Sequence, residues 1–192
     1  MDIDKEMRKP VRLIAAACRN MGIGKNGRLP WSLANELHFF QDTITSVSTP
    51  EKKNLLVFGR GSWLSCPETF FPFANCLNVV LSKTLLTVPK HAHYLCKDFE
   101  SAIRLAIEPP LRHIVETIWI LGGSAVYKES LEHPWCDLIY LTDIMAEFDC
   151  DVFFPEFDHN VFRKQKSFLG VPDEIHEENG IKFQFQVFKK EA

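Results

Sequence analysis

Short apolar runs recur along the first three quarters of this chain, and segments with helical patterning or turn residues separate them. A run of about five apolar residues is short for a buried helix but suits a strand covered on both faces. Strands that alternate with helices are typical of a parallel sheet, so the pattern predicts an α/β domain with helices on both faces. We expect these strands at 13–18, 54–58, 77–81, 93–96, 117–121 and 138–142.

The remaining segments complete this expectation. Ser32 and Asp98 are suitable N-caps for two of the helices. Beyond residue 142 the pattern changes, because 162–168 and 181–188 have the character of an antiparallel pair and Asn179-Gly180 is a strong turn signal. The sheet is therefore expected to be mixed, mostly parallel, with a C-terminal antiparallel hairpin. The expected helices lie at 32–45, 59–66, 98–107 and 124–132.

The length of 192 residues favours a single domain, which we place at 11–190 after a loose N-terminal tail at 1–10. Lys and Arg total 22 against 25 Asp and Glu, and this net charge of −3 argues against a nucleic-acid or anionic membrane partner. The N-terminus has no apolar signal segment, no run suffices for a membrane span, and the six cysteines form no C-x-x-C pair. We therefore expect a cytoplasmic monomer with free thiols and no metal site.

Seven of the nine glycines fall into three clusters, and each cluster follows an expected strand. Glycine lets backbone N–H groups approach a phosphate, and in open α/β sheets ligands bind beyond the carboxyl ends of the strands. Plain tight turns explain any one cluster equally well, but three together favour a nucleotide. The clusters are Gly22, Gly24 and Gly27, then Gly59 and Gly61, then Gly122 and Gly123.

The first cluster matches the dinucleotide fingerprint G-x-G-x-x-G, but we reject that interpretation. The fingerprint must open a helix, whereas here Pro30 follows closely and disfavours helical geometry at the residue before it. Arg60 with Ser62, and Ser82 with Lys83, pair a cation with a hydroxyl after a strand and are better phosphate contacts. Surface charge is the simpler explanation for each pair alone.

Glu36 is the most informative charged residue. On a helical wheel it falls at the edge of an apolar stripe formed by Leu33, Leu37, Phe40 and Ile44. A carboxylate there either reaches solvent from the boundary or is buried to bind a ligand. Burial without a partner is costly, so a buried Glu36 would fit a ligand that donates two N–H bonds.

Six motifs in a fixed order carry a resemblance. They are M-G-I-G-K-N-G-R-L-P-W at 21–31, N-E at 35–36 with F-Q at 40–41, W-I-L-G-G-S-A-V-Y at 119–127, L-T-D at 141–143, D-V-F-F-P-E at 151–156 and G-I-K-F-Q-F at 180–185. From about residue 11 to residue 189 the chain resembles the dihydrofolate reductases. Glu36, where bacterial relatives have Asp, and the long loops resemble the animal type, and no thymidylate synthase domain follows, as in monofunctional members.

The resemblance implies NADPH-dependent reduction of 7,8-dihydrofolate to tetrahydrofolate, which supports one-carbon metabolism and thymidylate and purine synthesis, with antifolates as inhibitors. Glu36 would accept bonds from the pterin ring N–H and amino group. Thr142 would hydrogen-bond Glu36, Trp31 would hold an adjacent water, and Leu29 would complete the catalytic set. The other residues implied at the substrate are Ile14, Ala16, Leu37, Phe40, Gln41, Ser65, Cys66, Phe70, Cys76, Leu121 and Tyr127.

NADPH is the implied cofactor. The resemblance also implies a cis peptide link at the Gly122-Gly123 pair. The residues implied near the nicotinamide are Ala16, Ile23, Gly24, Gly27, Arg28 and Leu29; those near the adenosine phosphates are Arg60, Gly61, Ser62, Ser82, Lys83, Thr84 and Lys97; and those along the pyrophosphate are Gly122, Gly123, Ser124, Ala125, Val126 and Tyr127.

Three residues depart from the family pattern. Cys76 stands where the family usually has an arginine that clamps the α-carboxylate of the folate glutamate tail, and a thiol cannot replace a bidentate guanidinium. Phe70 stands where animal enzymes have a polar tail-binding residue, and Gly61 replaces a basic residue near the 2′-phosphate. We therefore expect a raised KM for dihydrofolate and a relative preference for small lipophilic inhibitors.

Two other functions compete with this interpretation. One is a catalytically silent folate- or nucleotide-binding module of the same fold, which the intact Glu36, Thr142, Trp31 and Gly-Gly pair disfavour. The other is a pyrimidine reductase of riboflavin synthesis, which shares the fold and NADPH but gives no reason for a carboxylate at Glu36.

Overall fold

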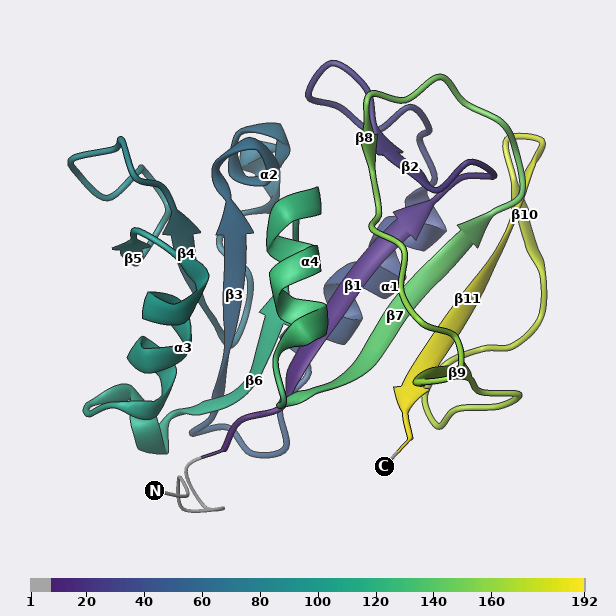
Figure 1. The fold of residues 1–192 in the computed structure, drawn as a ribbon. Helices are drawn as coiled ribbons and strands as arrows, with labels where there is room; N and C mark the ends of the chain where they lie inside the picture. Colours follow the sequence, from purple (N-terminus) through teal and green to yellow (C-terminus); the bar gives the residue numbers. More distant parts are fainter. Residues whose placement is uncertain (1–7, 192) are drawn as a thin grey trace.

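The apolar runs of the sequence form the strands of one mixed sheet in the computed structural model, which describes residues 8–191 (Figure 1). The strand order is β10-β11-β7-β1-β6-β3-β4-β5, with β9 paired to β11. Neighbours from β7 to β5 are parallel, whereas β11 is antiparallel to β7, β9 and β10. The strands are β1 (Val11–Ala17), β3 (Lys53–Gly59), β4 (Cys76–Leu81), β5 (Tyr94–Cys96), β6 (Val115–Ile120), β7 (Cys136–Ile144), β9 (Phe162–Lys164), β10 (His176–Glu178) and β11 (Ile181–Lys190).

Helices cover both faces of this sheet, as predicted (Figure 1). On one face lie α3 (Phe99–Ile107) and α4 (Ser124–Glu132), whose Phe99 and Tyr127 belong to the largest buried apolar cluster. On the other face lie α1 (Ala34–Thr45) and α2 (Arg60–Ser65), whose Ile44 and Trp63 belong to a second cluster. Burial of a large apolar side chain contributes about 1.5–3 kcal/mol, so these clusters fix the helices on the strands.

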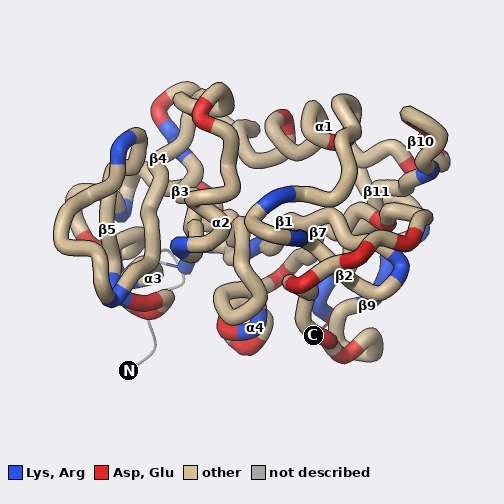
Figure 2. Tube along the Cα trace, turned by 90° about the horizontal axis from the view of Figure 1, so that it is seen from above, with Lys and Arg blue, Asp and Glu red and all other residues tan. Residues whose placement is uncertain are grey.

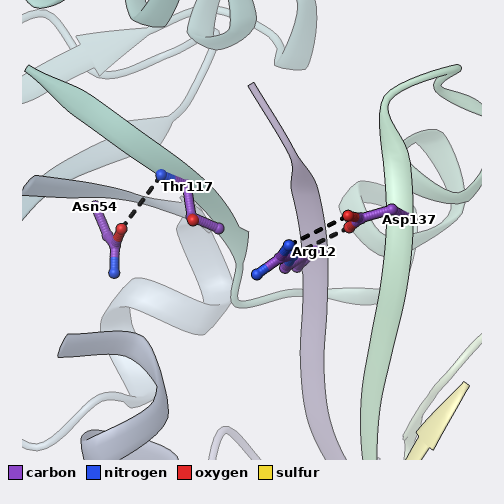
Figure 3. Close-up of polar contacts among 4 residues, drawn as sticks. All are labelled: Arg12, Asn54, Thr117 and Asp137. Carbon is purple, nitrogen blue, oxygen red and sulfur yellow. Dashed lines mark hydrogen bonds and ion pairs between the residues drawn. The ribbon is translucent and has the colours of Figure 1, made fainter. Parts of the chain in front are cut away.

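A buried amide fixes the end of α1. Asn54, at the start of β3, donates hydrogen bonds to the carbonyl oxygens of Ile44 (2.8 Å) and Ser46 (2.9 Å). Its Oδ1 accepts from the backbone N–H of Thr117 on β6 at 3.2 Å (Figure 3). One side chain thus satisfies the helix end and joins it to two strands, which holds α1 in register with the sheet.

An ion pair links two neighbouring strands. Arg12 Nε on β1 lies 3.1 Å from Asp137 Oδ1 on β7, and Nη2 lies 3.2 Å from Oδ2 (Figure 3). Both side chains are partly exposed, so the pair adds at most about 1 kcal/mol. The strand pairing itself therefore carries the stability here.

The N-terminus of α1 corrects one prediction. Ser32 does not cap the helix, which begins at Ala34, because Glu178 of β10 supplies the cap from far along the chain. Its carboxylate accepts hydrogen bonds from the backbone N–H groups of Ala34 (2.7 Å) and Asn35 (3.0 Å). Asp98, in contrast, caps α3 as expected by accepting from Ser101 N–H at 2.8 Å.

Two further segments differ from the expectation. The glycine-rich segment expected as plain loop contains β2 (Gly22–Gly24), which pairs antiparallel with β8 (Val152–Phe153). Strand β9, which is the antiparallel partner expected for β11, ends at Lys164 rather than at Phe168. Both differences arise from pairings between distant segments, which local patterns do not report.

The expected loose tail at 1–10 lies mostly outside the described residues. Lys9, however, is buried, and its ammonium donates to the carbonyl oxygens of Val115 (2.8 Å) and Arg112. The packed part of the chain therefore includes a residue that the expectation placed in the tail.

Candidate functional site

Three glycine clusters meet at one edge of the sheet. Strands β1, β6 and β3 are adjacent and parallel, so the glycines that follow them lie at the same carboxyl edge (Figure 1). A cavity of about 350 Å³ opens there between α1, α2 and the glycine-rich segment. Figure 2 looks down on this side and shows Lys and Arg interspersed with Asp and Glu rather than gathered into one basic face.

Glu36 faces this cavity from the first turn of α1. The side chain is buried, with 6% of its surface exposed, and desolvation raises the pKa of its carboxyl to about 7. Among residues 8–191 no group donates a hydrogen bond to the Glu36 carboxylate. The boundary alternative is therefore wrong, and the group either holds a proton or pairs with N–H donors of a ligand.

Thr142 and Trp31 are buried and do not line the cavity. Thr142 is buried on β7 opposite Ala16 of β1, and among the described residues it makes no hydrogen bond to Glu36. The Nε1 of Trp31 is buried and has no partner among those residues. A buried N–H without a protein partner fits the predicted water contact of Trp31, which stays a prediction.

Most of the residues predicted to contact the substrate line the cavity. Leu29, half exposed, lies at the mouth of the cavity. Burial raises the pKa of the Cys66 thiol to about 12, so this wall carries no thiolate. The predicted substrate residues that line the cavity are Ile14, Ala16, Glu36, Leu37, Phe40, Ser65, Cys66, Phe70, Leu121 and Tyr127.

Besides Thr142, two predicted substrate residues lie outside this lining. Gln41 is half-buried on α1, one residue beyond Phe40, and does not line the cavity. Cys76 is buried in the cluster of Ile44 and Phe73, and its thiol lies 3.4 Å from the carbonyl oxygen of Ile44. Cys76 thus fills apolar space beside the end of α1 and does not line the cavity.

The glycines of the cofactor side leave room for a backbone-lined ligand. A Cβ added at Gly61 or Gly123 would meet nothing within 4 Å, so both positions face open space. Gly123 precedes α4 and supplies no side-chain cap, which leaves N–H groups of that helix for a ligand. A Cβ added at Gly59 would lie only 3.0 Å from the carbonyl oxygen of Gly122. The Gly122-Gly123 link is cis, as implied.

Of the residues predicted near the adenosine phosphates, Gly61 and Ser62 line the cavity and the other five do not. Arg60 Nη1 lies 3.4 Å from Thr84 Oγ1, and Ser82 Oγ accepts from the N–H groups of Thr84 (3.2 Å) and Leu85 (3.1 Å). The cofactor residues in the lining are Ala16, Ile23, Gly24, Gly27, Arg28, Leu29, Gly61, Ser62, Gly122, Gly123 and Tyr127. Those outside it are Arg60, Ser82, Lys83, Thr84, Lys97, Ser124, Ala125 and Val126.

Four lining residues were not predicted, namely Ala15, Phe58, Pro67 and Val152. Phe58 directly precedes Gly59 at the end of β3, and its place before a glycine cluster was the signal available for it. Val152 belongs to β8, whose pairing with the glycine-rich segment has no local signal.

A family model described as dihydrofolate reductase matches residues 10–190. The chain belongs to the dihydrofolate reductase family. It is 43% identical over 185 residues to the dihydrofolate reductase of Bos taurus, covering 96% of this chain and 99% of that protein. It is 40% identical to a viral dihydrofolate reductase of Saimiriine herpesvirus 2, covering 92% of this chain and 83% of that one.

The solved structure of Schistosoma mansoni dihydrofolate reductase is similar to the whole fold. The TM-score is 0.84 at 34% identity, with 96% of this chain and 100% of that chain covered. Within residues 8–191 no helix combines the length and apolar character needed to cross a bilayer. The same residues contain no group of three or more His, Cys, Asp or Glu side chains placed to hold a metal ion.

Proposed function

We propose that this protein catalyses the NADPH-dependent reduction of 7,8-dihydrofolate to 5,6,7,8-tetrahydrofolate. Family membership supports this reaction. The observation that carries it in this chain is the buried carboxyl of Glu36, which faces an apolar cavity at a glycine-lined sheet edge. An unpaired buried carboxyl lowers stability unless a ligand uses it, so Glu36 supports a ligand with N–H donors at this site.

Glu36 orients the pterin. A carboxylate that accepts a ring N–H and an amino N–H together fixes the ring plane, because the two parallel bonds define both position and angle. With its pKa raised to about 7, Glu36 exchanges a proton near neutral pH and favours protonation of the ring nitrogen beside the accepting carbon. Trp31 Nε1, which is buried without a partner among residues 8–191, holds a water at this site.

The residues of the glycine-lined side fit a dinucleotide. NADPH, when bound, supplies the hydride. Gly122, Gly123 and Ser62 offer backbone and hydroxyl groups along the cavity, and Arg60, Ser82 and Lys83 offer cations and hydroxyls beyond its end. Ile23 and Leu29 close the mouth with apolar side chains and exclude water from the reacting rings.

Tyr127 holds the wall between the two ligands. Its hydroxyl, at the start of α4, donates to the carbonyl oxygen of Ile14 on β1 at 2.8 Å. Burial, with the nearby Glu36, raises the pKa of this phenol. Tyr127 therefore stays protonated and positions Ile14 against the substrate ring.

The far end of the substrate site is apolar in this protein. Phe70 lines the cavity, and its ring packs with Phe73 at 6.3 Å between centroids, while Phe71 packs with Phe73 at 5.4 Å. With Cys76 buried under α1, the glutamate tail of the substrate loses the usual cationic clamp. The result is a raised KM for dihydrofolate and a relative preference for lipophilic antifolates.

The protein acts as a monomer in the cytoplasm. The six cysteines are free thiols in the structure, which supports a reducing compartment.

The test is the loss of NADPH absorbance in the presence of 7,8-dihydrofolate, with Glu36→Ala as the control. Fast oxidation that the variant loses by about a hundredfold or more supports the reaction and the role of Glu36. Binding of NADPH without oxidation by the unmodified protein would instead indicate the silent module. Oxidation only with a pyrimidine precursor of riboflavin would assign the protein to that other chemistry.

A further inference from the structure

Two thiols that are far apart in the sequence meet beside the candidate site. The sulfur atoms of Cys18 and Cys150 lie 3.8 Å apart, although 132 positions separate the residues. Cys18 directly follows β1 and is buried, whereas Cys150 is partly exposed. Sulfur atoms at this distance are in van der Waals contact, and a disulfide bond between them requires an approach to ~2.05 Å.

The pair lies where the glycine-rich segment joins the segment that carries β8. Cys150 packs on Gly22 so closely that a Cβ there would collide with its sulfur. Gly24 O accepts from Asp151 N–H at 2.9 Å, and Met21 O accepts from Phe154 N–H at 2.9 Å. The two segments therefore already touch on both sides of the thiols.

A second cavity lies beside the two cysteines in the sequence. It is lined by Arg19, Asn20, Glu147, Phe148 and Asp149, which are the chain neighbours of the two cysteines. Asn20 Oδ1 accepts a hydrogen bond from Cys18 at 3.0 Å, so the buried thiol is oriented within the pair. The charged residues of this lining are Arg19, Glu147 and Asp149, so the cavity presents both signs of charge.

We propose that Cys18 and Cys150 form a modification site for low-molecular-weight disulfides, at which thiol–disulfide exchange converts the pair into an intramolecular disulfide. A peptide disulfide with carboxylates, such as oxidised glutathione, has the required chemistry. The product ties the base of the glycine-rich segment to the segment that carries β8.

The exchange proceeds in two balanced steps. The Cys150 thiol loses its proton to solvent, and its sulfur attacks one sulfur of the small disulfide, which forms a mixed disulfide and releases one small thiolate. The Cys18 sulfur, after losing its proton, attacks Cys150 Sγ and releases the second small thiolate. Both thiolates take up the two protons, so two protein thiols are oxidised and one small disulfide is reduced.

The disulfide restricts one wall of the candidate site. Ile23, Gly24 and Val152 line the main cavity from the two segments that it joins. Ligand exchange needs this wall to open, and loop opening limits the turnover of many enzymes. The cross-link therefore lowers kcat by about tenfold and leaves the chemistry at Glu36 intact.

The test is incubation of the full chain with oxidised glutathione, followed by peptide mapping and activity measurement before and after a dithiol reductant. A peptide that links Cys18 to Cys150, with reversible loss of turnover, supports the proposal. A mixed disulfide that stays on Cys150, or no modification, would overturn it. A cross-link that leaves turnover unchanged would overturn the inference that the disulfide restricts the wall of the main cavity.

Single variants Cys18→Ser and Cys150→Ser should keep basal turnover and lose the response to the oxidant. Cys96→Ser, on the far strand β5, is the matched control and should respond like the unmodified protein. The turnover readout rests on the proposed function, whereas the linked peptide does not. A failure of the proposed function can therefore be distinguished from a failure of the disulfide proposal.

Discussion

At the scale of the residue, Glu36 makes stability depend on pH. Burial raises the pKa of its carboxyl from 4.5 to about 7, so the folded chain binds more protons than the unfolded chain between those values. The contribution of this group to the free energy of unfolding is fully present below about pH 4.5 and is lost as pH rises through 7. The loss amounts to about 3 kcal/mol.

Glu36→Gln removes this dependence. We expect the variant to be more stable than the unmodified protein at about pH 8, with the difference fading towards about pH 5. Urea unfolding at both pH values measures it. A difference in midpoint that stays constant with pH would contradict the burial of an ionisable group at this position.

Cys76 is the second residue with a testable consequence. Cys76→Arg should tighten an inhibitor that bears a glutamate tail by about tenfold relative to a tail-less one, because a charge-assisted pair contributes about 1.5–3 kcal/mol. The ratio of the two inhibition constants is the measurement, and Cys76→Ser is the neutral control. An unchanged ratio would show that the loss of arginine at position 76 does not cause the expected preference for lipophilic inhibitors. The buried place of Cys76 predicts some loss of stability in the arginine variant.

At the scale of the element, the start of α1 depends on a distant side chain. Glu178→Ala leaves the N–H groups of Ala34 and Asn35 without their acceptor and should cost about 1–2 kcal/mol of unfolding free energy. Glu177→Ala, the exposed neighbour on the same strand, is the matched control and should cost far less. Thermal unfolding of the two variants compares them, and equal losses would argue against the cap.

Elements with a strong local signal could be predicted closely. The helix 124–132 follows a Gly-Gly pair and has the predicted bounds, and α3 begins after its Asp98 cap. The β2–β8 pairing and the Glu178 cap could not be predicted, because each joins segments more than a hundred residues apart. Local periodicity reports which face of an element is buried but not which distant group covers its ends.

At the scale of the whole molecule, the adjacency of three parallel strands places glycines that are scattered in the sequence at one site. The sequence placed each cluster after a strand, but only the order β1-β6-β3 shows that they share an edge. The Glu36 stripe likewise indicated an apolar face, while the cavity that the carboxyl enters required the packing of α1 against β3. Cys76 shows the converse, because its place in the alignment gave no hint that its thiol turns under α1.

The most direct test of the central claim is the pH dependence of hydride transfer in a single turnover. If Glu36 controls protonation of the pterin, the rate falls about tenfold per pH unit above about pH 7. The Glu36→Gln variant should then be at least about a hundredfold slower and show no such fall. An unchanged pH profile in the variant would contradict the role assigned to the buried carboxyl.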